Sequence, residues 1–254
     1  DIVVFGADTD ISPYDSGSYA SSTAYLTGTA VVKTCEALKE KILHKAAKYL
    51  ETGAEELEFD GKRVYKLACE ADGTRKEITI KDLANRVQCA NEDALQVTQS
   101  HSSPISPPPF MAGAAEVEVD LETGQVELIK FAAAVDCGTP LNENLARVQT
   151  EGGLVQGIGM ALYEDVSYSK DGKVHENSFM QYKVPSRLDV GRVQVEFESS
   201  FEPTGPFGAK SIGEVVINTP SPAIANAVYN AVGVRIRELP ITAEKVFKGM
   251  NGLD

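Results

Sequence analysis

The chain has 254 residues, of which 43% are hydrophobic and 24% charged, which is the composition of a folded protein of one or two domains. Its net charge of −13 argues against nucleic acid or an anionic membrane as a partner, because both attract basic surfaces. No apolar run reaches the ~18 residues of a membrane-spanning helix, and no signal peptide is expected at the start of the chain.

The cysteines and histidines give no sign of a metal site. Four cysteines are widely spaced, and none has the Cys-x-x-Cys spacing of zinc or iron–sulfur sites. Buried free thiols in a reducing cytosol are the simplest interpretation, which predicts a cytoplasmic protein. The three histidines are far apart, so neither a histidine metal cluster nor a catalytic triad is indicated. The cysteines are Cys35, Cys69, Cys89 and Cys137.

The first fifty residues predict a short strand and a long helix. Residues 1–6 contain the apolar run 2–5 and indicate a short buried strand, followed by a polar loop. A helix is predicted from about Ser18 to residue 50, ended by Gly53, and its small and apolar residues recur every three to four positions. This spacing predicts one buried face. The face consists of Ala24, Gly28, Val31, Cys35, Leu38, Ile42, Ala46 and Leu50.

Residues 55–90 predict a small subregion rich in hairpins. Asp60-Gly61 is a two-residue turn between strands at 57–59 and 63–65, and Thr79 is expected to cap a short helix at 82–87. Nothing in this subregion resembles a catalytic constellation. The prolines of residues 101–113 predict an extended connector to the second half of the chain.

The second half mixes strands and helices. Strands are predicted at 117–119, 126–135 and 193–197, with the second central and covered on both faces, and a strand–turn–strand unit at 166–174. Helices are predicted at about 144–162 and 220–231, the latter capped by Ser221. A strand at 234–239 precedes a final helix capped by Thr242. Mixed sheets with long packed helices in this order predict an α+β fold.

Three segments rich in glycine and hydroxyl groups, at residues 17–23, 152–159 and 205–214, are candidates for a site. Each has a simpler structural interpretation: helix caps in the first, close helix packing in the second and a turn in the third. The glycines of the segment at 152–159 require an explanation in any case, because each glycine inside a helix costs ~1 kcal/mol. Either another backbone or a ligand must approach that helix closely.

Taken together, the three segments suggest a binding site for a flat anionic cofactor. The helix start near residues 18–23 offers amide groups and hydroxyls to a phosphate. Gln156 offers a donor and acceptors on a helix face cleared by glycine. Glu214 follows a glycine-shaped loop and can act as a general base, with a plain surface acid as the alternative.

A family resemblance leads to the same site by a separate route. Gly-Pro-Phe-Gly-Ala-Lys at 205–210, Gly-Glu at 213–214 and Pro-x-Pro-Ala-Ile-Ala-Asn-Ala from residue 220 resemble the C-terminal signature of the molybdenum-binding subunit in the xanthine dehydrogenase/oxidase family, the molybdenum hydroxylases. Residues 15–23, 136–142 and 151–159 resemble three further family motifs in the same order. The chain departs from the family at Val215-Val216, where prolines are common, and at Glu143, which replaces a usual proline.

The resemblance implies that residues 1–254 are the C-terminal half of a molybdopterin-binding subunit, with Glu214 as the active-site base. Such an oxidoreductase hydroxylates a heteroaromatic, purine-like ring or an aldehyde with water-derived oxygen, and electrons leave through Fe-S and FAD partners. The implied cofactor is molybdopterin, with or without a cytosine dinucleotide, and the N-terminal part of the subunit is a further partner. The implied cofactor contacts are Tyr19, Ala20, Ser21, Ser22, Thr23 and Gln156.

A second hypothesis is a non-catalytic fragment or accessory binding module of the same fold, and the isolated chain is expected to be inactive. The two hypotheses differ in geometry. A cofactor site requires Glu214, Gln156 and residues 21–23 to converge on one cleft.

Overall fold

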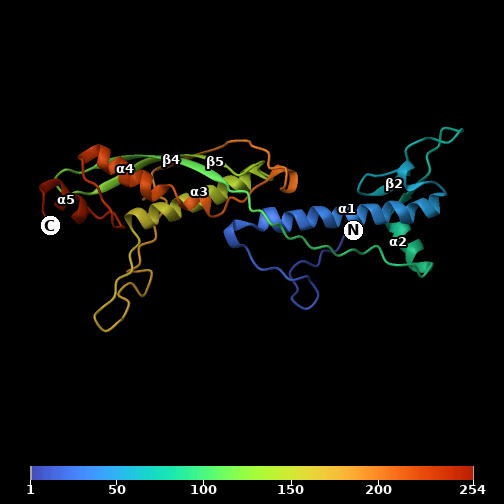
Figure 1. Cartoon of the computed structure of the whole chain (residues 1–254), viewed down its shortest axis with the longest axis horizontal. Coiled ribbons are helices and arrows are strands. Elements are labelled where there is room, and N and C mark those ends of the chain that lie inside the picture. Colours follow the sequence, from blue (N-terminus) through green and yellow to red (C-terminus); the bar gives the residue numbers. More distant parts are fainter. Residues whose placement is uncertain (1, 254) are drawn as a thin grey trace. The chain divides into compact units, whose positions relative to one another are not determined.

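A computed structural model describes residues 2–253 and divides the chain into two compact units (Figure 1). Unit 1 comprises Asp1–Gly17 and Leu26–Pro104, and unit 2 comprises Ser18–Tyr25 and Ile105–Asp254. The three candidate segments lie in unit 2, except that Gly17, the first residue of the segment 17–23, belongs to unit 1. Unit 2 therefore carries the residues that matter for the site.

Unit 1 contains most of the long helix α1 (Thr23–Leu50), a small sheet and the helix α2 (Ile80–Cys89). The sheet has the antiparallel order β1-β2-β3, from Leu57–Phe59, Arg63–Lys66 and Glu77–Thr79. The hairpin at Asp60-Gly61 is confirmed, although its turn is longer than predicted, because residues 60–63 lie between the paired Phe59 and Val64. The cap of α2 is confirmed as well, since Thr79 Oγ1 accepts the Asp82 N–H at 3.1 Å. A 3₁₀ turn (Ala54–Glu56) joins α1 to the sheet.

The core of unit 1 forms where the end of α1 meets the sheet and α2. The predicted buried face of α1 holds only in this part, because Val31 is 54% exposed and Cys35 is exposed as well. α1 stops at Leu50 as predicted, but Gly53 is not its cap, because Glu51 takes the positive φ of 53° and Gly53 is extended. The core residues are Ile42, Ala46, Leu50, Leu57, Val64, Ile78, Leu83 and Val87.

Unit 2 is built on a three-stranded sheet with the order β4-β5-β6. The strands are β4 (Phe110–Val119), β5 (Val126–Asp136) and β6 (Arg192–Phe197). β4 runs antiparallel to β5, whereas β6 runs parallel to it, so the chain must cross over between them. The helix α3 (Glu143–Leu162) supplies this crossover, and residues 163–191 form a long excursion before β6 (yellow in Figure 1).

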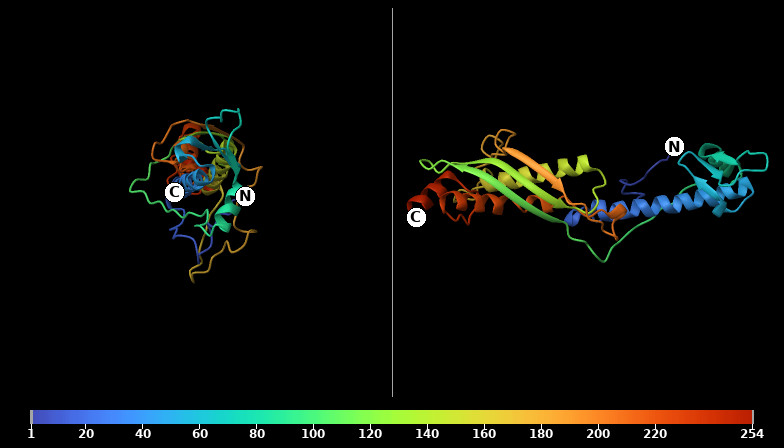
Figure 2. Two further views of the ribbon diagram at one scale, coloured as in Figure 1. Left: turned by 90° about the vertical axis from the view of Figure 1, so that its right-hand side faces the viewer. Right: turned by 90° about the horizontal axis from the view of Figure 1, so that it is seen from above.

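Helices α3 and α4 (Pro220–Val232) pack on one side of this sheet, and α5 (Ala243–Asn251) follows at the end of the chain (Figure 2). The predicted α+β fold class is confirmed. β5 is central as predicted, but it is not covered on both faces, because Ile129 is 38% exposed and Ala134 is exposed. The side chains that join the layers include Leu128, Phe131, Val135, Leu154, Ile158, Ile224 and Val228.

Several other strand predictions were wrong. Residues 2–6 form no strand, and Ile2 and Phe5 are 67% and 65% exposed. Residues 234–239 are irregular, and the unit at 166–174 is reduced to the isolated bridge between Tyr168 and Val174. These apolar runs lack a neighbouring strand, and an unpaired run of β-forming residues gains nothing from its propensity.

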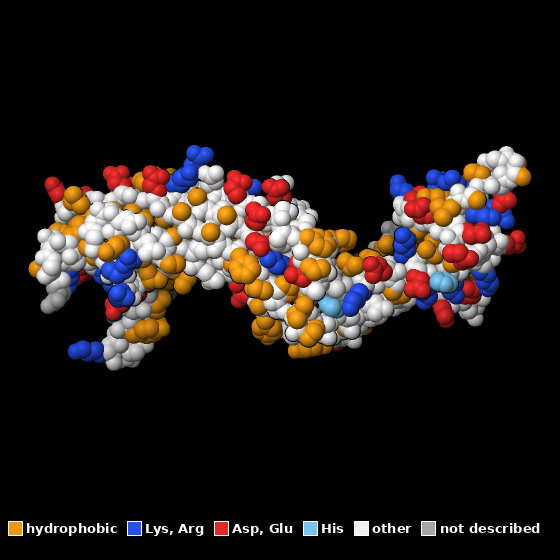
Figure 3. Space-filling model, turned by 45° about the horizontal axis from the view of Figure 1, so that its top comes forward, with side chains coloured by type: hydrophobic (Ala, Val, Ile, Leu, Met, Phe, Trp, Pro, Cys, Tyr) orange, Lys and Arg blue, Asp and Glu red, His pale blue; other side chains and the backbone are white. Residues whose placement is uncertain are grey.

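Helix caps were predicted more closely. Thr242 caps α5 by accepting the Lys245 N–H at 3.3 Å, while α4 begins at Pro220 after Thr219, slightly earlier than the predicted cap at Ser221. Within residues 2–253, no helix is long and apolar enough to cross a membrane. Charged side chains of both signs crowd the surface of unit 1, while the visible face of unit 2 has broader neutral and apolar areas (Figure 3).

Candidate functional site

Glu214 lies at the end of a loop that joins β6 to α4. The loop includes a 3₁₀ turn (Pro206–Gly208) and leads into a second one (Val215–Ile217), with Glu214 as its N-cap residue. It is fastened to the end of β5 by two backbone hydrogen bonds of 2.8 Å, from the Lys210 N–H to Cys137 O and from the Thr139 N–H to Gly208 O. The Glu214 side chain is exposed.

The contact between the two segments requires a glycine at position 138. Gly138 has φ of +71°, and a Cβ there would lie 2.3 Å from Gly208 O. A side chain would therefore push the loop away from β5. The motif at 136–142 thus holds the Glu214 loop against the end of β5.

Ser21 and Glu214 are brought together although 193 residues separate them. Ser21 Oγ donates a hydrogen bond to Glu214 Oε2 at 3.2 Å. Gly213 makes this approach possible, since a Cβ at that position would lie 2.8 Å from Ser21 Oγ. Two of the three segments selected from the sequence therefore meet directly, and both lie in unit 2.

Residues 19–22 form a strained turn in place of the predicted first turn of the helix. Tyr19–Ser21 is a 3₁₀ turn in which Ala20 and Ser21 have φ of +49° and +56°. Such backbone costs of order 1–3 kcal/mol per residue and concentrates at functional sites. The turn leads into the start of α1 at Thr23, where the first amide groups of a helix lack internal acceptors.

The side chains of this turn differ in accessibility. Ser22 is only 8% exposed, and its N–H is already bonded to Tyr19 O at 3.1 Å. Tyr19 is 72% exposed, Ser21 is partly buried, and Ala20 and Thr23 are exposed. A ligand at this turn therefore has direct access to all of these side chains except that of Ser22.

Close packing accounts for three of the four glycines of α3. A Cβ on Gly153 would lie 2.1 Å from Val216 Cγ2, and one on Gly157 would lie 2.9 Å from Ile217 O. A Cβ on Gly159 would meet Glu164 Oε1 at 2.1 Å. Gly153 and Gly157 therefore let α3 lie against the segment that directly follows Glu214.

Gly152 is different, because no atom lies within 4 Å of the position of its Cβ. Gln156 follows one turn later on the same face of α3 and is exposed. Gln149 lies earlier on this face, with Nε2 3.9 Å from the Cβ position of Gly213. The face leads from the Glu214 loop toward Gln156, about 10 Å along the helix axis from Gln149. We call it the α3 polar face, defined by Gln149, Gly152 and Gln156.

The convergence expected from the sequence is therefore only partly visible. Within residues 2–253, the hydrogen bond of the candidate site joins Ser21 to Glu214 and does not include Gln156. Gln156 lies on the helix that packs against the Glu214 loop.

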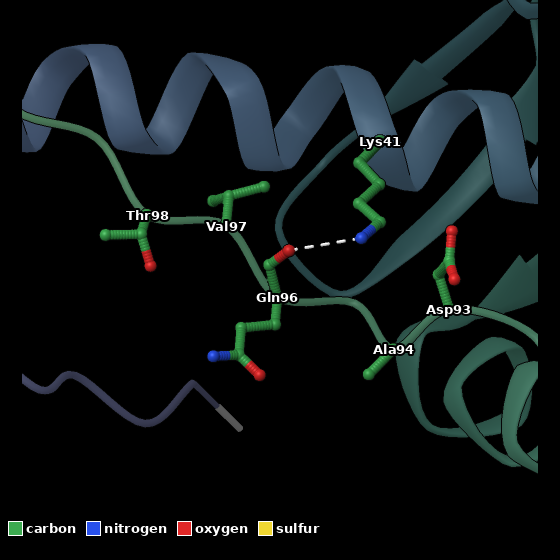
Figure 4. Close-up of a pocket in the computed structure, with 6 residues that line it drawn as sticks. All are labelled: Lys41, Asp93, Ala94, Gln96, Val97 and Thr98. Carbon is green, nitrogen blue, oxygen red and sulfur yellow. Dashed lines mark hydrogen bonds between the residues drawn. The ribbon is translucent and has the colours of Figure 1, made fainter. Parts of the chain in front are cut away.

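The two hollows that stand out in the surface lie elsewhere. One, of about 360 Å³, is a wide depression in unit 1 between α1 and residues 93–98 (Figure 4). Its one ammonium group, that of Lys41, donates to Gln96 O at 3.1 Å and is satisfied by the protein. The other, of about 280 Å³, lies in unit 2 between the end of α3 and Pro240. Neither has Ser21 or Glu214 in its lining, so the candidate site lies outside both hollows.

One element of the site was missed by sequence reasoning, the ion pair between Lys210 and Asp136. Lys210 Nζ lies 2.8 Å from Asp136 Oδ2. Burial alone would raise the pKa of Asp136, but bonds from Lys210, Ser200 and the Gly138 amide together lower the pKa below its usual value. The sequence features that could have indicated this pair are an acid, Asp136, at the end of a predicted buried strand and a lysine, Lys210, within a glycine-rich loop.

The candidate site can be compared with known proteins. Residues 1–191 match the family of the molybdopterin cofactor-binding domain. The chain is 33% identical over 252 residues to the probable hypoxanthine oxidase XdhD of Escherichia coli strain K12, covering 98% of this chain and 26% of the relative. It is 31% identical to the putative xanthine dehydrogenase molybdenum-binding subunit XdhA of the same strain, covering 97% of this chain and 33% of the relative.

A solved structure shows the same fold. The chain aligns with the crystal structure of the Cu,Mo-CO dehydrogenase with a TM-score of 0.81 and 27% identity, over 96% of this chain and 31% of that one. The chain belongs to the molybdopterin cofactor-binding domain family of the xanthine dehydrogenase-type molybdenum hydroxylases. It spans between 26% and 33% of the length of these relatives.

The side chains of the site fit a molybdopterin. The strained Ala20–Ser21 turn and the start of α1 offer the amide and hydroxyl donors that a phosphate needs. The empty space beside Gly152 and the exposed amide of Gln156 suit the edge of a flat, hydrogen-bonding ring.

Proposed function

We propose that this chain holds a molybdopterin-type cofactor and supplies the general base, Glu214, of a molybdenum hydroxylase. The observation that carries the proposal is the hydrogen bond from Ser21 Oγ to Glu214 Oε2 at 3.2 Å. It joins the segment proposed to bind the cofactor to the acid proposed to act on the substrate. The family match over residues 1–191 supports the cofactor part of this proposal.

Each residue has a distinct task in this proposal. Residues 19–23 hold the phosphate end of the cofactor through the exposed Tyr19, Ala20 and Thr23 and the partly buried Ser21. The buried Ser22 supports the shape of the turn through the bond from its N–H to Tyr19 O. Gln156 binds the ring through its amide. When bound, the molybdenum cofactor supplies the oxygen-transfer chemistry and accepts two electrons.

The overall reaction replaces a C–H bond by C–OH, consumes one water and releases two protons and two electrons. Glu214 takes up one of these protons from the attacking oxygen as a general base. The bond from Ser21 fixes the orientation of the carboxylate, which reduces the freedom lost when the substrate is aligned.

The substrate proposed is a heteroaromatic, purine-like ring or an aldehyde. Support comes from relatives named for hypoxanthine and xanthine. Because the chain spans at most 33% of these relatives, we also propose three partners: the N-terminal part of the molybdenum subunit, an Fe-S module and an FAD module. The four cysteines are free, which supports the cytoplasm as the compartment, although Cys137 alone among them is buried as the sequence predicted. We propose a molybdopterin with or without a cytosine dinucleotide, because both forms carry a phosphate that such a turn can bind.

The alternative is a non-catalytic fragment or accessory module, and one observation favours it. Glu214 and Gln156 are both exposed within the described residues, so this chain by itself does not enclose a reaction centre. The isolated chain is accordingly proposed to be inactive, and the enzyme to be the complex with the remaining subunit parts.

The two proposals are separated by the molybdenum and pterin content of the purified native complex, together with the variant Glu214→Gln. We expect near one molybdenum per chain, and in the variant a loss of turnover with molybdenum and pterin retained. A folded complex without molybdenum would support the accessory module. Parallel loss of molybdenum and turnover in the variant would remove Glu214 as the base.

A further inference from the structure

Lys210 is the one charged side chain among the buried polar side chains of residues 2–253, with 8% of it exposed. Its ammonium group lies 2.8 Å from Asp136 Oδ2 and 5.3 Å from the centre of the Phe110 ring. Phe110 and Asp136 are paired across β4 and β5, so the charge is held at one end of the sheet.

The Asp136 carboxylate accepts three hydrogen bonds. Oδ1 accepts from Ser200 Oγ at 2.6 Å and from the Gly138 N–H at 3.0 Å, while Oδ2 accepts from Lys210. The end of β5 is therefore tied at this carboxylate to two points of the loop between β6 and α4, Ser200 near its start and Lys210 further along. Removal of the Asp136 charge would leave the Lys210 ammonium buried and unpaired, and removal of the Lys210 charge would leave the partly buried Asp136 carboxylate without its cation.

The position of Lys210 links this cluster to the candidate base. Only Ser211, Ile212 and Gly213 separate Lys210 from Glu214, and Ser211 is itself buried at 6% exposure. On the other side of Glu214, Val216 packs against Gly153 of α3. Glu214 is thus an exposed residue with buried residues on both sides of it in the chain, Lys210 and Ser211 before it and Val216 after it.

We propose that the Lys210–Asp136 pair positions the Glu214 carboxylate for proton transfer, an inference that rests on the proposed role of Glu214 as base. A buried ion pair of this kind is weak evidence for stability, since apolar residues of similar size often stabilise a core equally well. Its directional hydrogen bonds instead hold the loop in one position. Lys210 is a positioning residue that acts through Glu214.

The test uses the complete molybdenum-containing complex with the variants Lys210→Met, Asp136→Asn and their combination, compared with Lys210→Arg. Methionine keeps the volume of the lysine stem and both backbone bonds of the loop. Since small misplacement of a reacting group can lower a rate by about 100-fold, we expect kcat to fall by about 10- to 100-fold in Lys210→Met and in the combined variant. KM and molybdenum content should stay within about twofold, and Lys210→Arg should recover part of kcat because it can still pair with Asp136.

A double-mutant cycle with Glu214→Gln separates positioning from packing. If Lys210 acts through Glu214, adding Lys210→Met to Glu214→Gln should lower kcat no further. Hydrogen exchange of amides 209–214 in cofactor-free protein should be faster in Lys210→Met and recover in Lys210→Arg.

Several outcomes would overturn the inference. Additive losses in the cycle, or parallel loss of molybdenum and kcat in Lys210→Met, would reduce the pair to packing. Wild-type kcat in the combined variant would show that the pair is not needed for positioning. Failure of the proposed function is distinguishable, because Glu214→Gln would then retain wild-type turnover whatever Lys210 does.

Discussion

Two adjacent glycines of α3 allow a sharp test of the proposed cofactor surface. We consider the substitutions Gly152→Ala and Gly153→Ala. Both positions are helical, so alanine gains ~1 kcal/mol of helix propensity at each. At Gly152 no atom lies within 4 Å of the new methyl group, and the full gain should appear as increased stability of the cofactor-free protein.

At Gly153 the same gain is opposed by packing. The new Cβ would lie 2.1 Å from Val216 Cγ2 and 3.0 Å from Val216 Cβ. Overpacking of this kind costs ~1–3 kcal/mol, which leaves a net change between about zero and 2 kcal/mol of destabilisation. Gly153→Ala is the matched control, because it alters the same helix one residue away on a different face.

The functional expectation is opposite to the stability expectation. Gly152 lies on the α3 polar face beside Gln156, where we propose that the ring of the cofactor binds. Gly152→Ala should therefore give a more stable protein that retains less pterin and molybdenum. The measurements are urea denaturation of the cofactor-free full-length protein and the pterin and molybdenum content of the purified complex.

Two results would refute the reasoning. Undiminished pterin content in Gly152→Ala would show that the α3 polar face is not a cofactor surface. A loss of stability in the same variant would show that the space beside Gly152 is filled by protein in the complete molecule.

Two further predictions concern the loop and the acid stability of unit 1. Gly213→Ala would place a Cβ 2.8 Å from Ser21 Oγ, so we expect loss of turnover with unchanged circular dichroism; unchanged turnover would show that the Ser21–Glu214 contact is dispensable. Bonds led by Lys45 and then Lys48 lower the pKa of Glu92 to about 2. This depressed pKa stabilises the fold fully above the ordinary glutamate value of about 4.3 and less as pH falls toward 2. Glu92→Gln should therefore flatten the fall in urea stability between pH 5 and pH 2.5, and an unchanged slope would contradict the assignment.

Features governed by neighbours in the sequence were predictable. The turn at Asp60-Gly61 and the caps at Thr79 and Thr242 depend on backbone groups within a few residues, so their chemistry is visible in the sequence itself. The order of strands and long helices likewise determined the α+β class.

Features that need a distant partner were not predictable. The apolar runs at 2–6 and 234–239 have strand propensity but no strand beside them, and they remain irregular. The face of α1 is buried only where the small sheet and α2 cover it, which periodicity alone cannot reveal.

The candidate site shows the same difference between local features and features that need a distant partner. The sequence by itself selected Ser21, Gln156 and Glu214 as candidates, because glycine, hydroxyl and carboxyl groups in those motifs have a recognisable chemistry. Only the tertiary structure decided that Ser21 touches Glu214 across 193 residues and that Lys210 pairs with Asp136 across 74. It also distinguished Gly152, which faces open space, from Gly153, which faces Val216. The physical reason is that such contacts form only after the chain between them has been closed and packed, and local preferences do not specify that step.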